Sequence, residues 1–163
     1  MKKKIYITRK LPDLVIAKLS AEFDVRTWKE ADRDVPREIL LEELKDATGL
    51  ICMLSDTIDK EVIDAAPSLK VISTMAVGYN NIDIEAATER GIIVTNTPGV
   101  LTEATADLTF ALLMATARRL IEASDYLKKG LWETWSPIHL TGMVIHGSTI
   151  VIIVLGRIGG ALA

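Results

Sequence analysis

The chain has 163 residues, of which 49% are hydrophobic, enough to bury a core in one or two small domains. A formal net charge of −3 and a pI of about 5.4 argue against nucleic acid or anionic lipid as partners. The three lysines near the start precede no signal-peptide core, and no stretch reaches the roughly 20 apolar residues of a membrane span. These features favour a cytoplasmic globular protein with no membrane partner.

In chain order, short apolar runs alternate with helical patterns. The runs are continuous and rich in β-branched residues, as is typical of strands buried on both faces. This alternation predicts an α/β fold with a parallel sheet. The predicted elements are strand 4–8, helix 14–23, strand 25–28, helix 37–44, strand 49–54, helix 60–66, strand 70–74, helix 84–89 and strand 92–95.

Proline and glycine mark several of these boundaries. Pro12 and Pro36 are predicted in the first turns of their helices, where a missing N–H costs nothing. Gly91 fits the end of a helix that leads directly into a strand. The one cysteine, Cys52, lies in an apolar run and is interpreted as a small core residue, so neither a disulfide framework nor a multi-cysteine metal site is expected.

The pattern changes after Pro98 and Gly99, which we interpret as a domain boundary. A helix is predicted over 102–129, with Thr102 as its N-cap and a length of roughly 40 Å. Its segment 108–117 is apolar on nearly every face, so we expect it to be buried between two bodies. A turn with two tryptophans and a final buried strand, 149–155, are predicted to follow.

A glycine-rich turn follows that final strand in the sequence TIVIIVLGRIGG, residues 149–160. Gly156 and Gly159 fill the second and third glycine positions of a dinucleotide fingerprint. The second glycine lets the backbone approach the pyrophosphate, and the third permits close packing of the helix. Val154 stands at the first position, where a β-branched side chain opposes a positive φ. The fingerprint is therefore damaged, and a plain strand–turn–helix corner remains the alternative.

A second constellation, TMAVGYNNID at residues 74–83, follows the predicted strand 70–74. Loops at the carboxyl ends of parallel strands are where α/β sheets bind ligands. Gly78 lacks a Cβ, so successive backbone N–H groups there can converge on a carboxylate. The alternative is an ordinary turn in which Asp83 caps the next helix.

Residues 73–119, with GLWETWSP at 130–137 and LGRIGG at 155–160, resemble the D-isomer-specific 2-hydroxyacid dehydrogenases, in particular glyoxylate reductases of archaeal type. The resemblance runs from about residue 4 to residue 163. It implies a flavodoxin-like substrate domain over 1–98. It also implies the incomplete beginning of a Rossmann NAD(P)-binding domain over 99–163.

The resemblance also implies roles for particular residues. The Val77 and Gly78 N–H groups match the donors to the substrate carboxylate, and Met53 matches a residue near the substrate. Trp132 and Trp135 match an arm that packs on a second subunit, with core filling as the alternative. On the cofactor side, Thr105 matches a residue beside the nicotinamide, and the pyrophosphate turn is matched by Gly156, Arg157, Ile158 and Gly159.

Family members transfer hydride between a nicotinamide and the carbonyl carbon of a 2-keto acid, with a catalytic Arg, an acid and a His. No residue in this sequence matches those three, and His139 and His146 match neither role. Two hypotheses follow. The first is that the chain is part of an enzyme that reduces glyoxylate or a related 2-keto acid. The other is a non-catalytic folding or dimerisation module, or a truncated gene product, with at most weak carboxylate binding.

Because no residue matches the catalytic Arg, acid and His, the second hypothesis is favoured for this polypeptide and we expect no turnover by it alone. Because of Val154, and because no acidic residue matches the one that binds the ribose, we expect weak or absent NAD(P) binding. The predicted strand 149–155 ends a sheet whose other strands are not in this sequence. Since an unpaired apolar edge promotes self-association, we expect a homodimer or larger assembly.

Overall fold

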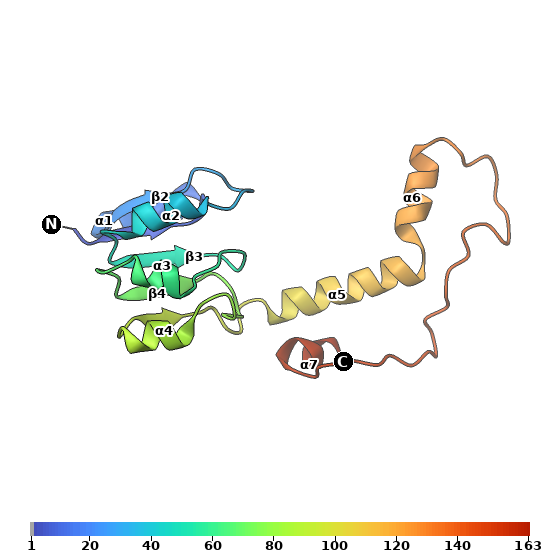
Figure 1. Ribbon diagram of the computed structural model, residues 1–163. Coiled ribbons are helices and arrows are strands. Elements are labelled where there is room, and N and C mark those ends of the chain that lie inside the picture. Colours follow the sequence, from blue (N-terminus) through green and yellow to red (C-terminus); the bar gives the residue numbers. More distant parts are fainter. Residues whose placement is uncertain (1) are drawn as a thin grey trace. The chain divides into compact units, whose positions relative to one another are not determined.

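The computed structural model describes residues 2–163, which form two compact units. The first unit ends at Pro98 and the second runs from Gly99 to Ala163 (Figure 1).

The first unit is built on a five-stranded parallel sheet in the order β2-β1-β3-β4-β5. This is the order of flavodoxin-like sheets, so the predicted α/β class and parallel sheet are confirmed. It brings the carboxyl ends of β1, β3 and β4 side by side. The strands are β1 (Lys4–Ile7), β2 (Asp24–Thr27), β3 (Gly49–Cys52), β4 (Val71–Thr74) and β5 (Ile93–Thr95).

Four helices connect these strands, and three of them bury side chains in one core. They are α1 (Asp13–Glu22), α2 (Arg37–Leu44), α3 (Lys60–Asp64) and α4 (Ile84–Glu89). Tyr6, Leu50, Ile72 and Val94 are successive register partners across four strands, so they form one row on one face of the sheet. The apolar side chains of α2, α3 and α4 join this row in a single cluster.

The ends of these helices follow the predicted boundaries closely. Pro12 and Pro36 each lie one residue before the first helical residue. The Asp83 carboxylate accepts a hydrogen bond of 2.9 Å from the Ala86 N–H, as a capping residue does. Gly91 follows α4 with a φ of 64°, the left-handed geometry that a glycine accepts without strain.

In the second unit, the predicted single helix over 102–129 is wrong. The structure has two helices, α5 (Thr102–Ala117) and α6 (Leu120–Lys128), separated at Arg119, whose φ of 54° interrupts the helical hydrogen bonds. The Ala117 carbonyl accepts from the Met143 N–H at 2.7 Å, so the returning chain takes over an acceptor that a continuous helix would need. Thr102 is also not the N-cap, which is Leu101.

Within the described residues α5 buries one residue, Ala106, so the expected packing of 108–117 between two bodies stays a prediction. Leu108, Phe110 and Leu112 are each more than half exposed. The predicted strand 149–155 is irregular backbone that leads into α7 (Arg157–Leu162). A strand needs a neighbour to accept its backbone hydrogen bonds, and none of the described residues pairs with this segment.

No helix in residues 2–163 combines the length and apolarity needed to cross a bilayer.

Cys52 is fully buried at the end of β3, which confirms it as a core residue. Burial raises the pKa of its thiol to about 12. We therefore expect no measurable reaction of the folded chain with a thiol reagent at neutral pH, and full reaction of its single cysteine in urea. Rapid labelling without urea would contradict this.

The same pKa shift makes stability depend on pH. In the unfolded chain the thiol ionises near its usual pKa of about 8.5. The folded state favours the neutral thiol, so its contribution to stability is complete below that pH. It is lost as the pH rises from there towards 12. A Cys52→Ala variant should lose less stability than the parent chain between neutral and alkaline pH in urea titrations.

Candidate functional site

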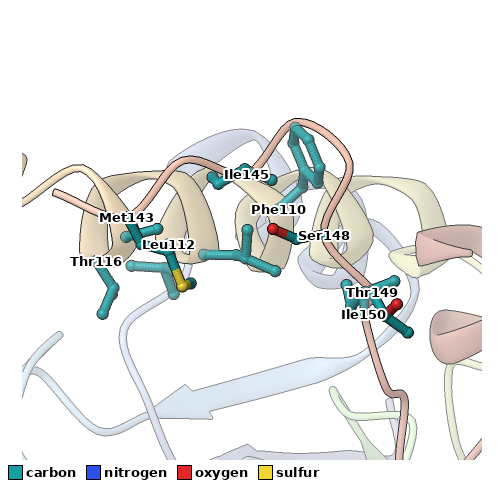
Figure 2. Close-up of a pocket in the computed structure, with 10 residues that line it drawn as sticks. Phe110, Leu112, Thr116, Met143, Ile145, Ser148, Thr149 and Ile150 are labelled. Carbon is teal, nitrogen blue, oxygen red and sulfur yellow. The ribbon is translucent and has the colours of Figure 1, made fainter.

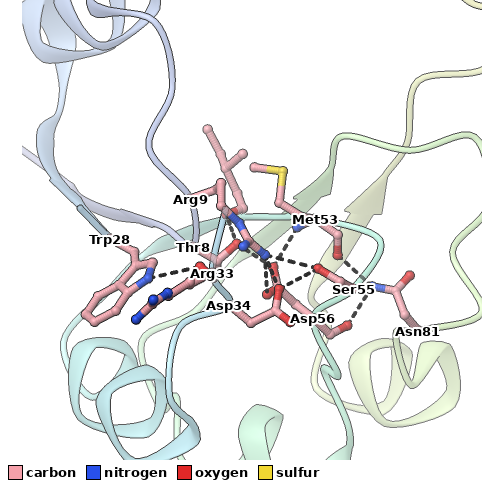
Figure 3. Close-up of polar contacts among 10 residues, drawn as sticks. Thr8, Arg9, Trp28, Arg33, Asp34, Met53, Ser55, Asp56 and Asn81 are labelled. Atoms are coloured by element: carbon pink, nitrogen blue, oxygen red, sulfur yellow. Dashed lines mark hydrogen bonds and ion pairs between the residues drawn. The ribbon is translucent and has the colours of Figure 1, made fainter. Parts of the chain in front are cut away.

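The carboxyl ends of β1, β3 and β4 lie at one edge of the sheet, and the loops that follow them are joined by polar contacts (Figure 3). The Thr8 N–H donates to the Ile51 carbonyl at 3.0 Å, and the Met75 N–H donates to the Cys52 carbonyl at 3.0 Å. These bonds extend the strand pairing by one residue. They fix where each loop begins.

Asp56 is the centre of the polar contacts in the loop after β3. Only 5% of this residue is exposed. Its carboxylate accepts a 2.7 Å hydrogen bond from the Met53 N–H and another from the Thr8 hydroxyl, and the Arg9 guanidinium lies 3.9 Å away. A buried carboxylate needs such partners to offset the loss of water. Asp56 therefore ties the Met53 loop to the end of β1.

Arg9 extends this cluster toward the surface. Its guanidinium donates to the Ser55 hydroxyl at 3.0 Å and pairs with Asp34, whose carboxylate also accepts from Ser55 at 2.7 Å. The Arg9 hydrogen bond, followed by that of Ser55, lowers the pKa of Asp34. Figure 3 shows the Met53 thioether directed away from this cluster, so Asp56 holds the backbone of Met53 and leaves its side chain free.

Asn81 links the loop after β3 to the loop after β4. Its side-chain amide donates to the Met53 carbonyl at 3.1 Å and to the Asp56 carbonyl at 2.8 Å. Its own carbonyl accepts from the Ile58 N–H at 2.9 Å. The predicted site residues Met53, Val77 and Gly78 therefore lie on two neighbouring loops that Asn81 holds together.

Val77 and Gly78 are exposed residues of the loop after β4. Neither N–H donates a hydrogen bond to any residue in the described part of the chain. The carbonyl groups of the same two peptide units are paired. The Ala76 carbonyl accepts from the Thr97 N–H at 2.9 Å, and the Val77 carbonyl accepts from the Asn96 side chain at 2.8 Å. Two adjacent donors are thus available to an acceptor from solution, the arrangement expected of an anion-binding loop.

Sequence reasoning missed Asp56, Arg9, Asn81 and Asn96. Asp56 and Arg9 lie in short polar stretches that have the composition of ordinary loops. Asn81 and Asn96 likewise lie in polar stretches that the sequence does not distinguish from ordinary turns. Only the strand order brings these side chains together, so local pattern alone held no signal for them.

The predicted cofactor residues lie in the second unit. Thr105 is in the first turns of α5, where its carbonyl accepts from the Thr109 hydroxyl at 2.7 Å. Gly156 is the N-cap of α7, and Arg157, Ile158 and Gly159 are the first three residues of that helix. Helices α5 and α7 pack against each other, so these residues belong to one packed pair.

Val154 has a φ of 73°, a left-handed backbone geometry that glycine accepts and a β-branched residue resists. A Cβ on Gly159 would lie 2.5 Å from the Val154 carbonyl oxygen, so Gly159 is required for this close approach. The glycine at 159 thus fits a dinucleotide turn. The irregular backbone over 149–155 and the exposed Val154 side chain do not, and these residues form no complete cofactor cradle.

Replacing Val154 by Gly should therefore raise the free energy of unfolding by about 1 kcal/mol, because it removes the left-handed strain. Urea unfolding followed by tryptophan fluorescence measures this, since two of the three tryptophans lie in the second unit. Val151→Gly is the matched control. Val151 is equally exposed and has no positive φ, so its replacement should give no gain. Equal effects of the two substitutions would contradict the strain.

The second unit also contains an apolar groove of about 550 Å³ between α5 and residues 143–150 (Figure 2). Its lining holds no ionisable side chain, so it has no charged group to pair with a carboxylate and no acid to protonate one. None of the predicted site residues lines it. The lining residues are Phe110, Leu112, Leu113, Thr116, Ala117, Met143, Ile145, Ser148, Thr149 and Ile150.

Two of the three tryptophans and both histidines lie near this groove in sequence but do not build a site. Trp132 and Trp135 are 56% and 76% exposed, so the core-filling interpretation is wrong for this chain. His139 packs its ring against Tyr126 with the ring centroids 4.5 Å apart, and His146 is exposed. Among residues 2–163, no group of three or more His, Cys, Asp or Glu side chains is arranged to hold a metal ion.

Comparison with known proteins gives consistent matches. The family model of the D-isomer specific 2-hydroxyacid dehydrogenase catalytic domain matches residues 5–139. The glyoxylate reductase of Pyrococcus horikoshii is 50% identical over 167 residues, covering all of this chain and 50% of the relative. That of Korarchaeum cryptofilum is 45% identical and likewise covers all of this chain and 49% of the relative. The chain thus spans about half the length of the curated relatives it matches.

Two crystal structures extend this comparison. A protein from Thermus thermophilus has a TM-score of 0.90 at 45% identity, over 98% of this chain and 51% of its own. An NADPH-dependent glyoxylate/hydroxypyruvate reductase from Sinorhizobium meliloti, in complex with NADP and malonate, has a TM-score of 0.78 at 33% identity, over 99% of this chain and 49% of its own.

Proposed function

Because the chain belongs to the D-isomer specific 2-hydroxyacid dehydrogenase family, we propose that it forms the amino-terminal part of an enzyme that reduces glyoxylate, or a related 2-keto acid, with NADH or NADPH. The relatives named glyoxylate reductase, at about 50% identity over all of this chain, support that substrate class. In the reaction a hydride passes to the carbonyl carbon and a proton to its oxygen. The products are the 2-hydroxy acid and NAD(P)⁺.

The observation that carries this proposal is the pair of free donors at Val77 and Gly78. A carboxylate has two oxygens that accept hydrogen bonds, and backbone N–H groups bonded to an ionised acceptor are stronger donors than in neutral pairs. We propose that both N–H groups bind the substrate carboxylate, with the Met53 side chain beside the substrate. Two such bonds predict a dissociation constant on the order of 1 mM for this chain alone.

We propose that residues 1–98 are the substrate domain and that residues 99–163 begin the cofactor domain. In that enzyme Thr105 would lie beside the nicotinamide, and the turn Gly156, Arg157, Ile158 and Gly159 would hold the pyrophosphate. Val154 and the irregular backbone before it argue that this polypeptide itself binds NAD(P) weakly or not at all. Titration with NADH followed by tryptophan fluorescence tests this, and tight saturable binding would contradict it.

We propose that this chain forms a homodimer, because its exposed apolar surface favours self-association. The second unit has an apolar groove, and its Trp132 and Trp135 are exposed; exposed apolar patches mark sites of association. Sedimentation should give a dimer or larger species. Trp135→Ser should shift the distribution toward monomer, while a monomeric parent chain would rule out the dimer.

An NMR titration tests carboxylate binding directly. Glyoxylate added to the ¹⁵N-labelled chain should shift the Val77 and Gly78 amide signals in a saturable way. Glyoxal, which keeps the carbonyl and lacks the carboxylate, is the matched control and should leave them unchanged. If glyoxylate leaves both signals in place, the proposed acid-binding loop is wrong.

Turnover is a separate question. We expect the purified chain, mixed with NADH or NADPH and glyoxylate, to give no sustained decrease in nicotinamide absorbance. Without a well-bound hydride donor there is no redox step to accelerate. A sustained decrease that scales with the amount of chain would overturn this expectation. It would favour an active enzyme over a non-catalytic module.

A further inference from the structure

We propose that Asn96 is a positioning residue for the acid-binding loop: its side-chain amide sets the direction of the Gly78 N–H. The proposal rests on the proposed function, because it assigns that direction a role in carboxylate binding. Asn96 follows β5 and lies outside the loop that it acts on.

The geometry of the peptide unit links Asn96 to Gly78. The Val77 carbonyl and the Gly78 N–H belong to the same planar trans peptide, so they point in opposite directions. The Asn96 amide nitrogen donates to the Val77 carbonyl oxygen at 2.8 Å. Holding this oxygen therefore directs the Gly78 N–H away from Asn96.

The preceding peptide is held in the same way by the next residue along. The Thr97 N–H donates to the Ala76 carbonyl at 2.9 Å, which directs the Val77 N–H away from the same segment. Thr97 precedes Pro98, and a residue before proline favours extended backbone. Two successive residues thus fix two successive peptide planes, and both donors are left unpaired.

Gly78 needs this restraint more than its neighbours do. It is exposed, it has no side chain to anchor it, and the nearest atom to a Cβ built there is Asn80 Oδ1 at 3.4 Å. A glycine permits rotation of the adjacent peptide plane at low cost. Within residues 2–163, the Val77 carbonyl has Asn96 as its hydrogen-bond donor. Loss of this bond should make the direction of the Gly78 N–H variable.

NMR relaxation of the ¹⁵N-labelled 163-residue chain tests this without any ligand. In the parent chain the Gly78 N–H order parameter should be near the rigid value of about 0.85, and in Asn96→Ala it should fall below about 0.6. Asn96→Asp is nearly isosteric and cannot donate when ionised, so it should show the same loss. Asn80→Ala, in the same loop, is the matched control and should keep Gly78 rigid.

A glyoxylate titration adds the binding readout. Asn96→Ala should bind glyoxylate about five- to tenfold more weakly than the parent, and Asn80→Ala should bind as the parent does. The urea midpoint should stay within experimental error, since the bond is on the surface. A rigid Gly78 in both Asn96 variants overturns the positioning role.

The two proposals fail in different ways. If the parent chain does not bind glyoxylate, the proposed function fails, while the Gly78 order parameter still decides whether Asn96 restrains the loop. If the parent binds and Asn96→Ala binds equally well, the positioning role is overturned and the proposed function stands. A large fall in the urea midpoint with unchanged Gly78 order means a general structural role, which also overturns the proposal.

Discussion

Replacing Asp56 by Ala is expected to lower the free energy of unfolding of the first unit by about 3 kcal/mol. The substitution leaves the Met53 N–H without its acceptor and the Thr8 hydroxyl with only a long bond of 3.4 Å to the Ile51 carbonyl. It also removes the buried charge that faces Arg9. Thr8 is fully buried, so water cannot replace the lost acceptor without rearrangement. Urea unfolding followed by circular dichroism measures the change.

Asp34→Ala is the matched control for this prediction. Asp34 pairs with the same arginine, but 59% of its side chain is exposed, and exposed ion pairs contribute little. Its loss should cost less than about 1 kcal/mol. Asp56→Asn keeps an acceptor of the same shape and should fall between the two. Equal destabilisation by Asp34→Ala and Asp56→Ala would show that burial of the carboxylate is not the cause.

The first unit could be predicted from its sequence because its local and tertiary signals agree. The apolar runs that predicted strands are the ones that form the sheet, and Pro12, Pro36 and Gly91 lie at helix ends as expected. The central strands β1, β3 and β4 contribute buried residues to one cluster with side chains of α2, α3 and α4. The hydrophobic pattern of one segment therefore reports on its own packing.

The second unit could not be predicted as well, because its structure depends on contacts that sequence pattern does not encode. The helix over 102–129 breaks where the Met143 N–H takes the Ala117 carbonyl, a contact between residues 26 positions apart. The apolar run 149–155 has strand composition but no partner strand in the described residues. Pattern specifies which side chains are apolar, while a strand exists only when another strand pairs with it.

The candidate site also has one part that the sequence predicts and one part that it does not. The loop containing Val77 and Gly78 was accessible from sequence because a glycine at the end of a predicted strand has a general physical meaning. Its supports were not. Asp56, Asn81 and Asn96 act through hydrogen bonds to backbone atoms of other loops, which any short polar residue in a turn is able to make. Their roles depend on the strand order, which only the fold defines.

Replacing Gly78 by Val is expected to weaken glyoxylate binding by at least tenfold while changing the free energy of unfolding by less than about 1 kcal/mol. The folded chain tolerates a Cβ there, because the nearest atom is Asn80 Oδ1 at 3.4 Å and the φ of Gly78 lies outside the left-handed range. The branched side chain would instead occupy space beside the Val77 and Gly78 N–H groups. A carboxylate needs that space to reach both donors.

The measurements are the same glyoxylate titration and urea unfolding that test the other variants, so stability and binding can be separated. Gly78→Ala adds a smaller side chain at the same place and should weaken binding by an intermediate factor. Affinity for glyoxylate should fall from Gly to Ala to Val at residue 78, while the free energy of unfolding stays nearly constant. Asp56→Ala should instead lower the free energy of unfolding. If Gly78→Val binds glyoxylate as tightly as the parent chain, the carboxylate does not bind at this loop.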